Sequence, residues 1–181
     1  MNNPDDCYIS VDIEAAGPVP HLYSMLSLGA CLCDADERQF EILFKPISKK
    51  FVPEAIAVSG FNLEDLQANG ADPQEAIRLF SDWVVTEAEG RRPVFVGLNA
   101  AFDWAFVNYY FVLFDLENPF GFAPIDIKAF FMGRLDATWK DSTSKKMSAV
   151  LGAKNSGNHK ALTDAIAQAE LFRLACAKSV R

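Results

Sequence analysis

The chain has 181 residues, half of them hydrophobic, and a formal net charge of −7 at pH 7. Its length predicts one domain over residues 1–181 with a substantial core, and the negative charge argues against a broad surface for polyanions. No apolar run is long enough to cross a bilayer, and residues 1–6 lack the pattern of a signal peptide. Four cysteines without Cys-x-x-Cys spacing indicate free thiols in a reducing compartment, so we expect a cytoplasmic protein without membrane contact.

The first predicted strand, residues 8–14, carries two carboxylates among apolar neighbours. Side chains alternate along a strand, so Asp12 and Glu14 share one face, about 7 Å apart, opposite the apolar side chains. Two anions this close repel each other, and β-branched neighbours favour an internal strand. A solvated strand end before Gly17-Pro18 is the simpler explanation. A bound cation is the alternative, which further converging acids would favour.

The rest of the chain alternates apolar strands with amphipathic helices. The expected elements are strands at 24–33 and 39–45 joined by a turn at 34–37, helices at 62–69 and from 73, a strand at 94–98, a helix at 99–116, a short strand at 124–127, and helices at 128–136, 144–152 and 160–178. Asn62 is the predicted N-cap of the first helix, and Pro46 and Pro53 interrupt regular structure before it. This order indicates an α/β fold with a mixed five-stranded sheet flanked by helices, with an antiparallel hairpin edge and later parallel strands.

Two segments allow either a structural or a binding role. The helix at 99–116 carries seven aromatic side chains on several faces, which suits a buried core helix or a homodimer interface. Residues 126–160 carry seven bases against three acids, a local charge of +4 in an acidic chain. An ordinary solvated surface and a phosphate-contacting patch both explain this charge.

Two helix starts carry further acids. Asn99 follows a strand and stands at the N-cap position of the next helix, which places Asp103 in the first turn. Asp164 lies beside the apolar side of the last helix, five residues after His159 and a glycine-containing loop. Helix capping and surface solubility explain these residues as simply as a binding role does, and convergence on Asp12 would decide between the explanations.

Three motifs, in this order, resemble those of the DEDD exonucleases: Asp12-x-Glu14, Asn99-x-x-x-Asp103 and His159-x-x-x-x-Asp164-Ala165. The histidine is typical of the DEDDh branch, which includes ribonuclease T, oligoribonuclease and the proofreading subunit of bacterial replicative polymerase. The resemblance covers about residues 7–176. It implies a single exonuclease domain with a ribonuclease-H-like fold, which releases nucleoside 5′-monophosphates from the 3′ ends of single-stranded or short nucleic acid.

The resemblance also implies a site for two divalent cations, Mg²⁺ or Mn²⁺ about 4 Å apart, which activate water, neutralise charge and assist the leaving alkoxide. By analogy with the family, Asp12 bridges both ions and Asp103 serves one of them through water. Glu14 and Asp164 complete the coordination of the ion that binds the nucleophilic water. His159 is then the general base, because imidazole exchanges protons near neutral pH, and its glycine-flanked loop lets it swing in with substrate.

Substrate contacts are predicted from the neighbourhood of the motifs. Phe61, Phe102 and Leu22 are candidates for stacking on terminal bases, worth about 1–3 kcal/mol per base, although each also suits the core. Asn99 is a further candidate because it belongs to the second motif. The candidates for phosphate contacts are Lys145, Lys146, Lys154 and Lys160, which would make activity fall with salt.

Three positions depart from the commoner family pattern: Ala16 replaces a frequent Thr, Ser27 a Glu or Gln, and Ser59 a His. None is a metal ligand in the family, so the departures concern the choice of substrate. The alternatives are a module that binds nucleic acid or protein without cleaving, and a polymerase proofreading subunit. We expect a free-standing enzyme, because few residues follow the last helix. Motif spacing does not separate DNA from RNA, since that choice depends on contacts to a 2′-hydroxyl.

Overall fold

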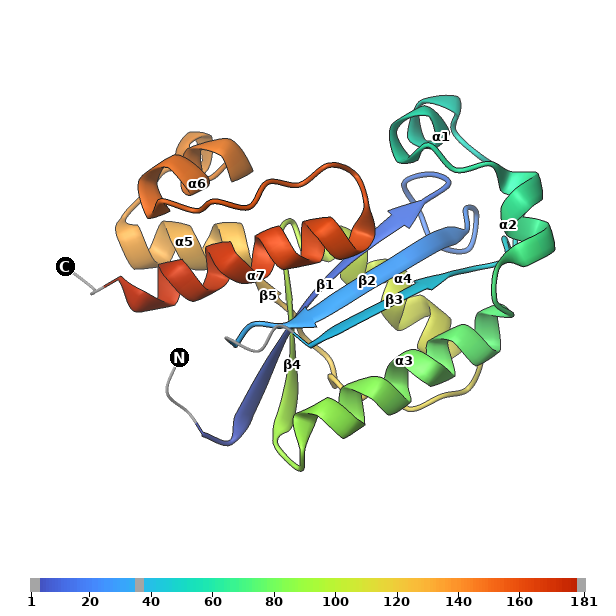
Figure 1. Cartoon of the computed structure of the whole chain (residues 1–181), viewed down its shortest axis with the longest axis horizontal. Coiled ribbons are helices and arrows are strands. Elements are labelled where there is room, and N and C mark those ends of the chain that lie inside the picture. The colour runs from blue at the N-terminus through green and yellow to red at the C-terminus, as the bar shows by residue number, and fades with distance from the viewer. Residues whose placement is uncertain (1–3, 35–37, 179–181) are drawn as a thin grey trace.

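The computed structural model describes residues 4–34 and 38–178 (Figure 1). Within these residues a five-stranded sheet has the order β3-β2-β1-β4-β5. The strands are β1 (Asp6–Ala15), β2 (Met25–Leu32), β3 (Gln39–Leu43), β4 (Arg92–Gly97) and β5 (Ile125–Asp126). β2 runs antiparallel to β1 and β3, whereas β4 runs parallel to β1 and β5. The predicted mixed sheet with its hairpin edge is confirmed; residues 35–37 of the expected turn lie outside the described residues.

Helices cover both faces of the sheet (Figure 1). They are α1 (Pro53–Ser59), α2 (Leu63–Asn69), α3 (Pro73–Ala88), α4 (Ala101–Leu113), α5 (Ile127–Leu135), α6 (Ser144–Leu151) and α7 (Ala161–Ala177), together with a 3₁₀ turn, η1 (Trp139–Asp141). One apolar cluster joins the sheet to α3 and α4, and another joins it to α5, α6 and α7. Ile9, Val11 and Ile13 belong to the first cluster, so the alternate residues of β1, Asp12 among them, face α7.

Local sequence explains most helix starts. The Asn62 side chain caps α2 as predicted, and Asp72 caps α3 in the same way, each accepting two backbone N–H groups of the first turn. The sequence predicted an interruption of regular structure at Pro53, but the structure has helix α1 beginning there. This proline stands in the first turn of α1, where its missing N–H costs no hydrogen bond and its fixed φ suits the helix.

The first turn of α7 rests directly on β2 at Gly29. A Cβ atom at Gly29 would lie 2.1 Å from the backbone nitrogen of Leu162 and 2.3 Å from the carbonyl carbon of Ala161. Gly29 is the β2 partner of Asp12 in the sheet register. The absent side chain therefore lets the last helix begin beside the acidic face of the first strand.

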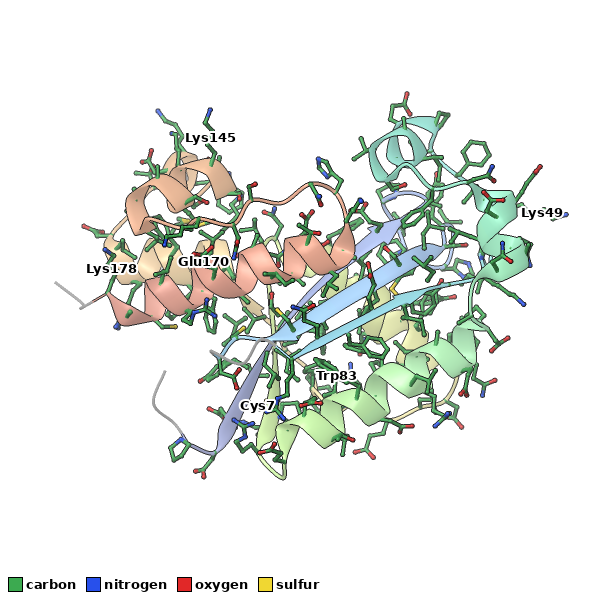
Figure 2. All side chains as sticks on the ribbon, viewed as in Figure 1. Cys7, Lys49, Trp83, Lys145, Glu170 and Lys178 are labelled. Carbon is green, nitrogen blue, oxygen red and sulfur yellow. The ribbon has the colours of Figure 1, made fainter. Side chains whose placement is uncertain are left out.

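Side chains fill the space between the sheet and its helices (Figure 2). Helix α4 buries Phe106, Tyr110 and Phe111 completely, so core packing accounts for much of its aromatic content. Its outer side remains apolar, with Val112 70% exposed. Among the described residues, no helix combines the length and the apolarity needed to cross a membrane.

Candidate active site

Segments far apart in the sequence meet near the end of the central strand. β1 carries Asp12 and Glu14, the first turn of α4 carries Asp103, and the start of α7 carries Asp164 after the loop with His159. The topology explains this meeting. β4 runs parallel to β1, so the helix that follows β4 begins at the same end of the sheet at which β1 finishes.

Asp12 lies at the centre of the cluster. Its Oδ1 accepts a hydrogen bond from Nε2 of Gln168 at 2.5 Å. Burial raises the pKa of Asp12 well above its usual range, and the charges of the three other acids raise it further. Like charges gathered around a buried carboxyl destabilise the folded chain unless a cation offsets them, so this environment suits a cation site.

Asp103 is fixed to β1 by a backbone contact. The residue is 4% exposed, although it stands in the first turn of a helix. Its Oδ1 accepts the N–H of Ile13 at 3.0 Å, between the two acids of the strand. Burial raises the pKa of Asp103 to about 7, against the opposing effect of backbone N–H groups. The side chain is therefore held toward Asp12 and Glu14 before any ligand binds.

Asn99 does not cap α4, contrary to the sequence-based expectation. Ala100 stands at the N-cap position, and Asn99 has φ of 57°, a left-handed conformation that asparagine adopts more readily than most residues. The N–H of Ala100 instead donates to Oδ2 of Asp126, at the end of β5, at 2.8 Å. This tertiary contact ties the start of α4 to the end of β5.

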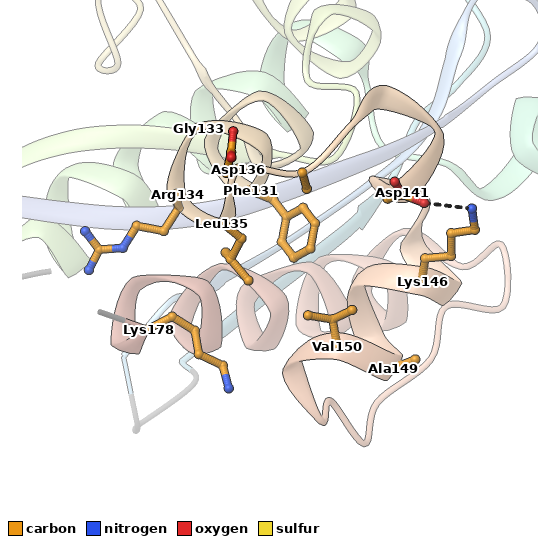
Figure 3. A pocket seen from close by; sticks show the side chains of 11 residues that line it. Phe131, Gly133, Arg134, Leu135, Asp136, Asp141, Lys146, Ala149, Val150 and Lys178 are labelled. Carbon is orange, nitrogen blue, oxygen red and sulfur yellow. Dashed lines mark hydrogen bonds and ion pairs between the residues drawn. The ribbon is translucent and has the colours of Figure 1, made fainter. Parts of the chain in front are cut away.

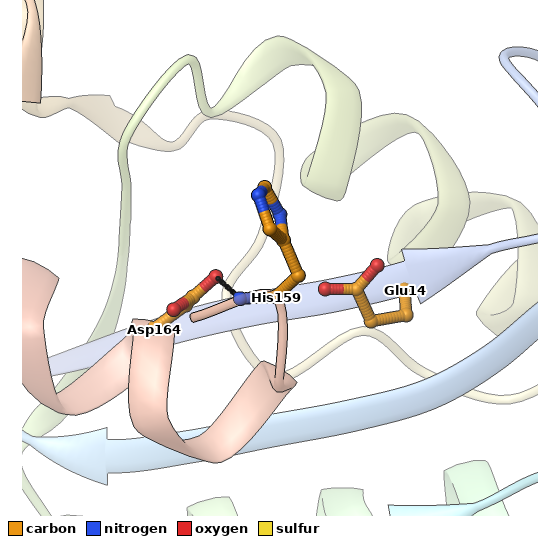
Figure 4. A group of neighbouring side chains, drawn as sticks. All are labelled: Glu14, His159 and Asp164. Atoms are coloured by element: carbon orange, nitrogen blue, oxygen red, sulfur yellow. Dashed lines mark hydrogen bonds between the residues drawn. The ribbon is translucent and has the colours of Figure 1, made fainter. Parts of the chain in front are cut away.

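Glu14, His159 and Asp164 form a compact group (Figure 4). One possible ligand atom of each residue lies within 4.8 Å of the other two. Burial and the charge of Asp164 raise the pKa of Glu14, whereas His159 acts in the opposite sense. Carboxylate oxygens are donors that Mg²⁺ and Mn²⁺ prefer, so the acids fit a divalent cation.

Asp164 also holds the loop before α7. Its Oδ1 accepts the N–H of Asn158 at 2.7 Å, and its Oδ2 accepts the N–H of His159 at 3.2 Å. A Cβ atom at Gly157 would lie 2.4 Å from Oδ1 of Asp164, so only glycine permits this approach. The backbone of His159, with φ of 59°, is thus anchored by an acid of the cluster.

Sequence reasoning missed Gln168. Its side chain is buried, with Oε1 accepting the N–H of Leu98 at 2.8 Å while Nε2 donates to Asp12. On the predicted apolar side of α7, Ala165 and Phe172 are buried as expected. A polar residue among them, four positions after Asp164, was the signal that could have identified it.

The candidates for substrate contact lie mainly at the surface. Phe102 is 39% and Leu22 41% exposed, and Asn99 and Lys160 are exposed. Phe61 is half-buried and packs against a small apolar cluster that includes Leu66. Their contacts with a substrate stay predictions.

A groove of about 960 Å³ lies apart from the acids, between α5, α6 and the end of α7 (Figure 3). The lining residues within the described chain include none of the four acids and not His159. Lys146, one of the predicted phosphate contacts, lines this groove and forms an ion pair with Asp141 at 3.1 Å. Part of the basic segment therefore belongs to a different surface from the carboxylate cluster.

Comparisons with known proteins point to one enzyme family. The family model RNase_T, described as an exonuclease, matches residues 9–172. The 3′-5′ DNA exonuclease Cap18 of Escherichia coli is 44% identical over 175 residues, which are 96% of this chain and 94% of that protein.

Solved structures share the fold. The nuclease domain of 3′hExo, a DEDDh family member bound to rAMP, has a TM-score of 0.79 at 18% identity, covering 100% of this chain and 98% of that one. The zinc-bound form of an Escherichia coli exonuclease I–single-stranded DNA complex has a TM-score of 0.73 at 16% identity, covering 93% of this chain and 40% of that one. The predicted ribonuclease-H-like α/β fold is thus confirmed.

Proposed function

This chain belongs to the exonuclease family and is a 3′-5′ exonuclease, and we propose that it degrades single-stranded DNA, releasing nucleoside 5′-monophosphates. The convergence of three further acids and a histidine on the region of Asp12 carries the proposal. The name of the Escherichia coli relative, at 44% identity, supports DNA over RNA.

We propose two Mg²⁺ or Mn²⁺ ions as the cofactor. The residues that would hold them are Asp12, Glu14, Asp103 and Asp164. Four carboxylates carry a charge of about −4, which two divalent cations balance. The pKa of Asp12 is raised first by burial and then by the repulsion of the other three acids, and bound cations would relieve that repulsion. Bound cations would supply charge neutralisation at the scissile phosphate and an activated water.

His159 is the proposed general base. Its ring lies beside Glu14 and Asp164, and a ring nitrogen would accept the proton of the attacking water. The Asp164 carboxylate holds the backbone of His159, so the imidazole is directed to the acids by one of them. Its exposed position leaves the ring access to an arriving substrate.

Binding of the DNA end would use stacking and a few phosphate contacts. Phe102 is at the start of α4, one residue before Asp103, and its exposure leaves area for a base. Phe61, Leu22 and Asn99 would complete this contact. Lys154 and Lys160 flank the His159 loop and would contact phosphates of the DNA end. A few such local contacts would be enough to bind a short end, although the chain as a whole is acidic.

We further propose that the protein acts in the cytoplasm as a single domain. All four cysteines are free, which fits a reducing compartment. A homodimer would use the exposed apolar side of α4, where Val112 and Leu113 lie. Sedimentation velocity at several protein concentrations would test the oligomeric state.

The decisive experiment follows 5′-labelled oligonucleotides of matched DNA and RNA sequence, with Mn²⁺ and with EDTA. We expect a ladder of labelled products that shorten with time, faster for DNA and absent in EDTA. A 3′-terminal phosphorothioate should delay the ladder, because attack begins at that end.

The other outcomes are equally informative. Internal cuts that ignore the blocked 3′ end would indicate an endonuclease. Retention of labelled DNA without cleavage would indicate a module that binds nucleic acid only. Faster loss of RNA would overturn the choice of DNA and leave the exonuclease chemistry intact.

A further inference from the structure

We propose that Gln168 is a positioning residue of the exonuclease: its amide fixes the rotation of the Asp12 carboxylate and thereby decides which oxygen of Asp12 meets a bound cation. The inference rests on the proposed metal-dependent function. None of the three motifs includes this glutamine, and its 5% exposure leaves almost no surface for a substrate. It would act through Asp12 alone.

The two hydrogen bonds of Gln168 determine each other. The N–H of Leu98 donates to Oε1 at 2.8 Å, and Nε2 donates to Oδ1 of Asp12 at 2.5 Å. A backbone N–H accepts no hydrogen bond, so the oxygen of the amide must face Leu98. The planar amide then directs its NH₂ group to Asp12, and a flipped amide would lose both bonds.

The three elements that meet at Gln168 are themselves fixed. Leu98 directly follows β4, Asp12 lies on the central strand, and α7 sits against β2 where Gly29 has no side chain. Gln168 is 5% exposed and lies one helical turn beyond Asp164, so the same side of α7 presents both residues to β1. The amide is therefore anchored by the backbone at the end of β4 while it holds the Asp12 side chain of the neighbouring strand β1.

Packing alone gives no reason for an amide at this position. The neighbours on α7, Ala165, Ala169 and Phe172, are apolar and buried, and an apolar side chain of similar length would fill the same space. The amide adds a donor aimed at one oxygen of Asp12. Removal of a donor that orients a metal-binding carboxylate typically lowers metal affinity or activity by about 10- to 100-fold. We expect a loss in this range for Gln168.

The test compares Gln168→Met with Gln67→Met, the same exchange at an exposed position of α2. Mn²⁺ binding is measured by isothermal titration calorimetry on the full chain, and kinetics with single-stranded DNA are measured in saturating Mn²⁺. We expect Gln168→Met to weaken Mn²⁺ binding about tenfold or more and to lower kcat by a similar factor. KM for DNA should stay within about twofold, since Gln168 is buried away from a substrate, and Gln67→Met should match the wild type.

A spectroscopic measurement on the unaltered protein keeps the proposal testable if Gln168→Met does not fold. The side-chain NH₂ signal of Gln168 in a ¹⁵N–¹H spectrum should shift during a Mg²⁺ titration with the same midpoint as the backbone N–H of Ile13, which Asp103 accepts. The NH₂ signal of Gln67 should stay in place.

The results that overturn the proposal differ from those that overturn the proposed function. Wild-type Mn²⁺ affinity in folded Gln168→Met, or a Gln168 signal that ignores Mg²⁺ while Ile13 responds, would reduce Gln168 to a packing residue. Absence of metal binding and cleavage in the wild type itself would instead refute the metal-dependent exonuclease.

Discussion

The inner and outer halves of the carboxylate cluster are held in place by different means. The inner half, Asp12 and Asp103, is enclosed by β1, α4 and α7, and its oxygens accept hydrogen bonds from a buried amide and from the backbone of the central strand. The outer half pairs His159, on a surface loop, with Asp164, in the first turn of α7, and there the acid holds the loop instead of being held by the core.

This difference separates two tasks within one site. The inner acids have raised pKa values because burial and their neighbours disfavour their charge, so they are preformed for cations at a cost in stability. In the outer group, His159 is open to solvent and to an arriving strand, and Asp164 is half-buried. Variants that act on one half and spare the other would sharpen this division, and variants that affect both equally would remove it.

The largest effect is expected in the inner half, from Asp103→Asn. The asparagine keeps an oxygen for the N–H of Ile13 but carries no charge for a cation, so kcat should fall about a thousandfold, equivalent to roughly 4 kcal/mol of transition-state stabilisation. Asp115→Asn, at an exposed residue just after α4 with φ of 54°, is the matched control. Steady-state cleavage of single-stranded DNA checks both, and equal activity of the two variants would contradict a role for Asp103.

The same substitution should stabilise the metal-free protein at high pH. The folded pKa of Asp103 is about 7 against 3.8 for an ordinary aspartate, so the folded state keeps the proton longer than the unfolded state does. This group therefore makes stability fall as pH rises from about 4 to 7, by up to about 4 kcal/mol at 1.4 kcal/mol per pKa unit. In EDTA at pH 8, urea unfolding should show Asp103→Asn to be more stable than the wild type, with the difference vanishing near pH 4. Mg²⁺ at pH 8 should favour the wild type, and an unchanged ranking would argue against cation binding at Asp103.

The outer half is tested by His159→Asn. Asparagine is chosen because it tolerates the left-handed backbone of this position. Loss of the general base should lower kcat about a hundredfold while leaving Mn²⁺ affinity within about threefold. His21→Asn, at the other histidine and also at positive φ, is the control. A parallel loss of Mn²⁺ affinity, measured by calorimetry, would make His159 a ligand and not a base.

The smallest effect is expected from Gly157→Ala. Its methyl group would meet Oδ1 of Asp164, so the loop or the carboxylate must shift, and kcat should fall about tenfold with little change in the free energy of unfolding. Gly133→Ala in α5, where the added methyl has open space in the described structure, should leave kcat unchanged. Unfolding curves and DNA cleavage check both variants, and equal kcat values would show that the outer half does not depend on close loop packing.

The sequence predicted the parts of this site that follow from local pattern. Alternation along β1 placed Asp12 and Glu14 on one face, and strand-to-helix spacing placed Asp103 in a first turn, because periodicity depends only on backbone geometry. Caps formed by adjacent residues, such as Asn62, were predicted for the same reason. Asn99 did not act as a cap because its backbone is left-handed and the helix begins one residue later, where the N–H of Ala100 donates to Asp126, 26 residues farther along the chain.

The sequence by itself thus determined most of the strands and helices, the order of the motifs and the shared face of Asp12 and Glu14 on β1. Only the tertiary structure decided that Gly29 admits α7 to the sheet beside Asp12, and that Gln168 reaches Asp12 from a position 156 residues away. The physical reason is that hydrogen bonds and close packing depend on distances between segments. Those distances are set when the whole core packs, and no local period in the sequence encodes them.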